Sequence, residues 1–119
     1  MKNSWISSQC LSLPGAVEDY KEEWDAWRYL IGDKMFAMVG TDNLKRPILT
    51  LKLEPEEGRL LREQYEDIGP GYYMNKLHWN SFLLEGSVPV EIMKACLSQA
   101  YQLVLAGLPK KVQAAIAGK

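Results

Sequence analysis

The sequence is poor in the residues that build most catalytic and metal centres. It holds one histidine, His78, and two cysteines, Cys10 and Cys96, which lie far apart in the chain. It has no CxxC pair and no Cys/His spacing typical of a zinc site. HExxH, GxSxG and P-loop motifs are missing as well. We therefore expect a protein that is not an enzyme, holds no cofactor or metal, and keeps both thiols buried and reduced.

Long hydrophobic runs are also missing. The uncharged run from Ala95 to Pro109 is shorter than the ~20 residues of a membrane-spanning helix, and polar residues interrupt it. The first residues, "MKNSWISSQCLSLPG", lack the unbroken apolar core of a signal peptide. These absences predict a soluble, cytoplasmic protein without a membrane partner.

Charge is small in total and uneven along the chain. Residues 1–67 carry 9 Lys and Arg against 13 Asp and Glu, whereas residues 68–119 carry 5 against 2. The overall isoelectric point of about 5.8 lies below the ~9 that is typical of strong nucleic-acid binders. Any binding to nucleic acid is therefore expected to be weak.

Length and patterning predict one domain over residues 1–119, because 119 residues fit a single core and 47% of them are hydrophobic. Apolar spacing indicates a helix over 3–13. Alternation on both sides of Gly32-Asp33 is typical of a β-hairpin, and 48–53 continues as a further strand. Residues 17–21 are a candidate strand.

The second half contains the signals for the other helices. Pro55 and Pro89 stand where helices begin, Gly69-Pro70-Gly71 and Gly107 stand where they end, and a short helix is expected after Pro109. One strand is expected between them, within 69–86. The result is an α+β fold in which an antiparallel sheet is packed on one face by two to three helices.

Five segments together resemble the MmcQ/YjbR family. They occur in the family's order and cover the chain from about Ser4 to Lys111: "LSLPGAVEDY", "GDKMFAMVG", "LTLKLEPEEG", "GYYMNKLHWNSFLLEGSVP" and "AYQLVLAGLPKK". The resemblance implies a frataxin-like (CyaY-like) fold and a "double wing" arrangement, in which strand hairpins contact DNA. Where relatives often carry Lys-Arg-His-Trp, this chain has Leu77 in place of the arginine.

A polar strand face is the candidate DNA-binding surface. On an extended backbone Lys76, His78 and Asn80 share one side, where lysine and histidine can meet phosphate and asparagine can read a base edge. Strand neighbours and the preceding loop add to this face. The candidate residues are Lys34, Lys52, Asn75, Lys76, His78 and Asn80. Because these residues can form only a few phosphate contacts, we expect weak, salt-sensitive binding to DNA.

A protein or a small ligand is the alternative partner. Exposed aromatic residues with a histidine form the candidate site, namely Tyr72, Tyr73, His78 and Trp79. The same residues can instead be structural, with Trp79 in the sheet core and the tyrosines covering a strand edge. The lysines can likewise be a solvated strand face that protects an edge. Carboxylates between Glu18 and Asp25 suit hard cations, but a solvated run of charge explains them as well.

Overall fold

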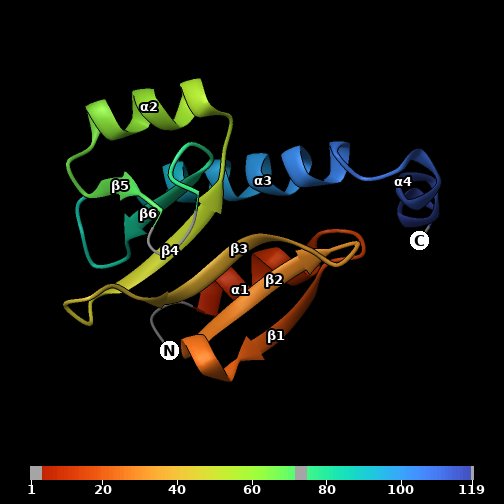
Figure 1. Ribbon diagram of the computed structural model, residues 1–119, viewed down its shortest axis with the longest axis horizontal. Helices are drawn as coiled ribbons and strands as arrows, with labels where there is room; N and C mark the ends of the chain where they lie inside the picture. The colour runs from red at the N-terminus through yellow and green to blue at the C-terminus, as the bar shows by residue number, and fades with distance from the viewer. Residues whose placement is uncertain (1–3, 72–74, 119) are drawn as a thin grey trace.

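The computed structural model describes residues 4–71 and 75–118 of the 119-residue chain (Figure 1). The helices are α1 (Ser4–Ser12), α2 (Pro55–Gln64), α3 (Val90–Ala106) and α4 (Lys110–Ala117). The strands are β1 (Val17–Lys21), β2 (Ala26–Ile31), β3 (Lys34–Thr41), β4 (Pro47–Lys52), β5 (Ile68–Pro70) and β6 (Trp79–Leu83). A 3-10 turn over Glu22–Trp24 joins β1 to β2.

The strands form one antiparallel sheet in the order β1-β2-β3-β4-β6-β5. Gly32 and Asp33 both have positive φ, at 55° and 65°, which matches the right-handed twist of the hairpin that they close. The predicted α+β class, the hairpin and the Pro-initiated helices are therefore confirmed. One expectation is wrong. Residues 69–86 contribute to two strands and not one. β5 forms at the sheet edge, where Gly69-Pro70-Gly71 was expected only to end a helix.

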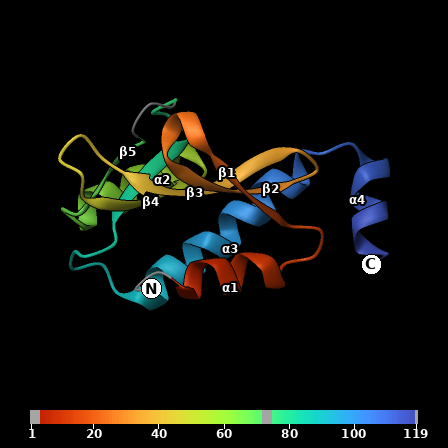
Figure 2. The ribbon, with the colours of Figure 1, turned by 90° about the horizontal axis from the view of Figure 1, so that it is seen from below.

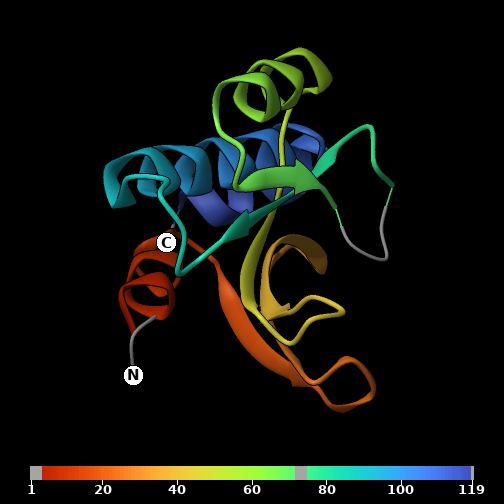
Figure 3. The ribbon, with the colours of Figure 1, turned by 90° about the vertical axis from the view of Figure 1, so that its left-hand side faces the viewer.

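Helices cover one face of the sheet. Figure 2 shows α1 and α3 together beneath it, and Figure 3 shows α2 beside α3 at the β5–β6 end. Phe36 is fully buried and meets the edge of the Tyr101 ring at a centroid distance of 5.5 Å. Leu51 and Asn80, which lie opposite each other in β4 and β6, share this helix-covered face.

Asp67, which directly precedes β5, forms hydrogen bonds with the turn that precedes α3. Its Oδ2 accepts hydrogen bonds from the Ser87 backbone N–H at 2.8 Å and from the Ser87 hydroxyl at 2.9 Å. These bonds, the backbone one first, hold the pKa of Asp67 below its ordinary value of 3.8. A carboxylate with a lowered folded-state pKa stabilises the fold above its ordinary pKa. That contribution is lost as the pH falls through the folded-state value.

Asp67→Asn is therefore expected to be less stable than the wild type at pH 7. The difference should shrink as the pH falls through the folded-state pKa of Asp67. Urea unfolding at a series of pH values measures it. Glu66→Gln, which alters an exposed neighbour, is the control. A deficit for Asp67→Asn that stays constant down to low pH would show that the charge of Asp67 contributes nothing.

Candidate nucleic-acid interface

Two of the candidate lysines meet at one end of the sheet. Because β3 and β4 are antiparallel neighbours, Lys34 at the start of β3 and Lys52 at the end of β4 lie at the same end. Lys52 is also paired in register with Trp79, the first residue of β6. We call the surface formed by Lys34 and Lys52 the basic end; Lys76 lies in the turn that leads into β6.

A cavity of about 330 Å³ opens at the basic end. Its lining residues are Lys34, Met35, Lys52, Trp79, Leu103, Val104, Gly107 and Leu108. The last four come from the C-terminal turn of α3 and the residues that follow it. The C-terminal end of a helix carries partial negative charge, which favours nearby ammonium groups. Among the described residues, neither Lys34 nor Lys52 has an ion-pair partner, so both charges are available to a ligand.

The loop before β6 is a turn and not an extended strand. Asn75 shapes it, because its Oδ1 accepts from the Leu77 backbone N–H at 2.8 Å and its carbonyl accepts from the Trp79 N–H at 3.0 Å. Lys76 is exposed within this turn. Lys76, His78 and Asn80 were expected to share one face of an extended strand. This expectation is wrong, because the strand begins only at Trp79. Tyr72 and Tyr73 lie outside the described residues.

Asn80 does not lie on the surface where it was expected. Its side chain is fully buried, its Oδ1 accepts a hydrogen bond from Arg62, and its Nδ2 donates to the His78 carbonyl at 3.2 Å. Gly58 of α2 allows this close approach, since a Cβ there would stand 2.7 Å from Asn80 Oδ1. Asn80 therefore holds α2 on the sheet and cannot reach a base edge.

His78 is half-buried beside this network. Its carbonyl accepts from the Leu53 N–H at 2.8 Å, and its ring Nδ1 is buried without a hydrogen-bond partner among the described residues. Buried polar atoms are nearly always paired, so an unpaired ring nitrogen is unusual in a purely structural histidine. Of the aromatic alternative set, Trp79 alone among the described members lines the basic-end cavity.

Comparison with known proteins adds the family. The YjbR family model matches residues 11–103. The chain belongs to the YjbR family. It is 33% identical over 111 residues to the uncharacterized protein YjbR of Escherichia coli K12, covering 93% of each chain. It is 32% identical over 91 residues to the uncharacterized protein YbdF of Escherichia coli O157:H7, covering 76% of this chain and 72% of that one. The resemblance seen in the sequence is thereby confirmed.

Solved structures share the YjbR fold. A Deinococcus radiodurans protein with a DUF419 domain superposes with a TM-score of 0.84 at 30% identity, covering 94% of this chain and 85% of that one. A Pseudomonas syringae protein gives a TM-score of 0.63 at 26% identity, covering 74% of this chain and 86% of that one. These likenesses support the fold and the family, and a fold by itself assigns no ligand.

Two of the carboxylates between Glu18 and Asp25, in the hairpin of β1 and β2, form ion pairs with basic residues of the same hairpin. Arg28 donates from Nε to Asp19 at 2.7 Å, and this bond is the main reason that the pKa of Asp19 is lowered. Lys21 lies 3.6 Å from Glu23. Within residues 4–71 and 75–118, no three histidine, cysteine or acidic side chains come together as metal ligands. The same residues contain no helix long and apolar enough to span a membrane.

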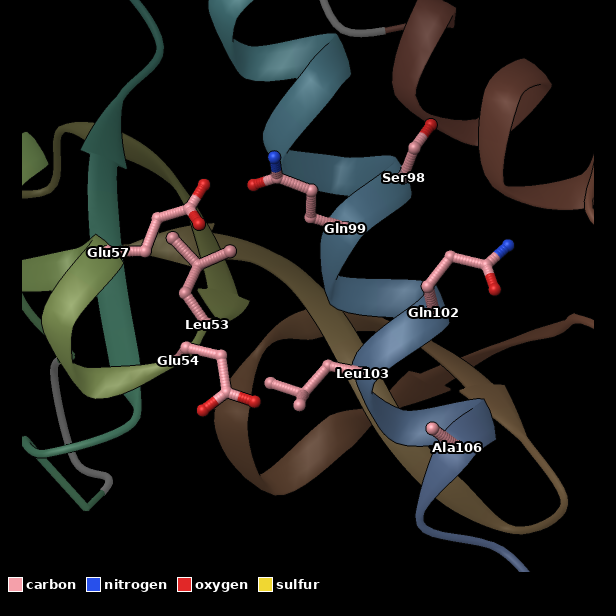
Figure 4. A pocket seen from close by; sticks show the side chains of 8 residues that line it. All are labelled: Leu53, Glu54, Glu57, Ser98, Gln99, Gln102, Leu103 and Ala106. Carbon is pink, nitrogen blue, oxygen red and sulfur yellow. The ribbon is translucent and has the colours of Figure 1, made fainter.

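A groove between α2 and α3 was not expected from the sequence. It has a volume of about 480 Å³ and is lined by Leu53, Glu54, Glu57, Ser98, Gln99, Gln102, Leu103 and Ala106 (Figure 4). Leu103 also lines the basic-end cavity, so the groove and the cavity are adjacent. No local sequence signal marks the groove, because its two walls are about 45 residues apart in the chain.

Proposed function

We propose that this YjbR-family protein is a non-catalytic binding module of the cytoplasm whose basic end contacts the phosphate backbone of double-stranded DNA. The observation that carries the proposal is that Lys34 and Lys52 line one cavity at the same end of the sheet and have no ion-pair partner within residues 4–71 and 75–118. Lys76 extends the charge along the loop before β6. With Asn80 buried, these contacts carry no base readout, so binding does not depend on the DNA sequence.

The absence of catalysis in this proposal rests on the candidate nucleophiles. Cys10 and Cys96 are both buried. Burial raises the pKa of the Cys10 thiol to about 12 and that of the Cys96 thiol to about 11, so neither forms the reactive thiolate at neutral pH. His78 Nδ1 has no partner among the described residues and so forms no nucleophile–base pair there.

Three phosphate contacts set the expected strength of binding. Each contact contributes about −0.9 to the slope of log K against log salt, so raising salt from ~50 to ~200 mM should weaken binding about 40-fold. Affinities should fall in the ~10⁻⁴–10⁻⁶ M range of non-specific complexes. If these three lysines bind phosphate, the affinity for DNA must therefore depend steeply on salt concentration.

A small anionic ligand is a second candidate, favoured by the shape of the basic-end cavity. Trp79, Met35 and Leu108 give it apolar walls beside the two ammonium groups, and its volume of about 330 Å³ lies within the range of small-molecule sites. An organic phosphate with an aromatic part would suit these walls. Such a ligand would compete with DNA for Lys34 and Lys52, whereas a partner bound mainly by apolar contact would be insensitive to salt.

The double variant Lys34→Gln/Lys52→Gln tests the proposal. For a labelled duplex, its slope of log K against log salt should become less steep by about 2. Its affinity should decrease equally for duplexes of different sequence. Fluorescence anisotropy measures both quantities. Lys94→Gln removes one charge from the other half of α3, where Lys94 lies over the Trp5 ring, and should leave the slope unchanged. Equal slopes for the wild type and the double variant would refute the proposed contacts.

A further inference from the structure

The groove between α2 and α3 has an apolar base and wall. Leu53, only 2% exposed, comes from the segment between β4 and α2, while Leu103 and Ala106 come from the last two turns of α3. Figure 4 shows these side chains lining the space between the two helices. A body of several carbon atoms can therefore lie in the groove with its apolar surface removed from water.

The polar part of the groove carries charge of one sign. Glu54 and Glu57 line its α2 side, Ser98, Gln99 and Gln102 line its α3 side, and no lining residue is basic. In Figure 4 the Gln99 side chain extends toward Glu57 and Leu53, while Gln102 points away from them. Gln99 thus offers an amide oxygen on the Glu57 side of the groove, which adds a further acceptor for a donor-rich ligand.

The two groove carboxylates differ from the neighbouring glutamates of α2, which have an ion-pair partner. Glu56 and Glu63, on the same helix, both pair with Arg59. Among the described residues, Glu54 and Glu57 make neither an ion pair nor a side-chain hydrogen bond, although Glu57 is half-buried. Burial first and the charge of Glu57 second raise the pKa of Cys96, which is buried on α3. The charge of Glu57 therefore reaches a buried part of α3, and no residue that lines the groove is basic.

We propose that this groove binds a small organic cation. Its ammonium or guanidinium group meets Glu57, and its apolar body lies against Leu53, Leu103 and Ala106. Charge complementarity selects the cation, because an anion would face the carboxylates of Glu57 and Glu54, and a neutral molecule would leave Glu57 unpaired. The inference does not rest on DNA binding, since the residues that hold the cation are not the lysines of the basic end.

Three probes of equal chain length test the charge requirement. The full-length ¹⁵N-labelled protein is titrated at pH 7 with n-hexylammonium, 1-hexanol and hexanoate, and amide shifts are followed by NMR. Hexylammonium should shift the amides of Glu57, Leu103 and Ala106 in a saturable way. Hexanol should bind at least about threefold more weakly, and hexanoate more weakly still. Equal affinity for hexylammonium and hexanol would overturn the proposal.

Matched variants locate the contact. Glu57→Gln should weaken hexylammonium binding about three- to tenfold and Glu54→Gln should weaken it less, whereas Glu56→Gln removes the same charge from the side that faces Arg59 and should change little. Equal losses in Glu56→Gln and Glu57→Gln would show a general charge effect and contradict the site. Titration with hexylammonium and duplex anisotropy are separate measurements on separate residues, so failure at the groove is distinguishable from failure of DNA binding.

Discussion

Phe36→Ala is expected to lower the free energy of unfolding by about 3–5 kcal/mol, the usual loss for a fully buried phenylalanine. Phe36 has no exposed surface, and its ring meets Tyr101 of α3 at an interplanar angle of 85°. Tyr101 in turn donates its hydroxyl to the Pro14 carbonyl after α1. The truncation therefore opens a cavity where β3, α3 and the end of α1 meet.

Urea denaturation followed by tryptophan fluorescence measures this loss. Leu60→Ala is the matched control, since Leu60 is 51% exposed on α2 and its truncation should change stability by less than about 0.5 kcal/mol. A loss below about 1 kcal/mol for Phe36→Ala would mean that Phe36 is not at the centre of the core.

Gly71→Ala is expected to destabilise the protein by about 1–3 kcal/mol through overpacking. A Cβ at Gly71 would stand 2.5 Å from Trp79 Cβ and 3.0 Å from the Trp79 backbone carbonyl carbon and oxygen. Those atoms belong to a paired strand and cannot rotate away. The Gly71 N–H also donates to the Trp79 carbonyl at 2.6 Å, so the β5–β6 hairpin must distort to accept the methyl group.

Gly69→Ala, two residues earlier, provides a direct comparison. A Cβ at Gly69 would meet nothing within 4 Å, so this substitution should be neutral within about 0.5 kcal/mol. Thermal unfolding of the two variants side by side tests the difference. Equal stabilities would contradict the close approach of Gly71 to Trp79. Because the hairpin positions Lys76 and Trp79, Gly71→Ala should also weaken DNA binding more than Gly69→Ala does.

Much of the fold could be read from local signals. Gly32-Asp33 required positive φ, and Pro55, Pro89 and Gly107 marked helix ends, so the hairpin and the two longer helices were expected where they occur. The β5–β6 hairpin was not expected, because Gly and Pro are common in breaks and short edge strands alike. Its pairing is decided by long-range contact with β6.

The candidate site was predictable only in part. Lys34 and Lys52 were expected to join one basic face because their strands are neighbours, and both line the basic-end cavity. The burial of Asn80 was not readable, because it depends on Arg62, 18 residues earlier, and on the missing Cβ of Gly58. The basic-end cavity was equally hidden, since Leu103 arrives from a helix that begins far along the chain.

We expect the basic end and Lys76 to bind DNA through phosphate contacts alone. The most direct measurement is anisotropy of a labelled ~20-base-pair duplex, titrated with the wild-type protein at ~50 and ~200 mM salt. Binding should be weak at the lower salt and about 40-fold weaker at the higher salt, to the same extent for unrelated DNA sequences. No binding at ~50 mM, or binding that salt leaves unchanged, would contradict it.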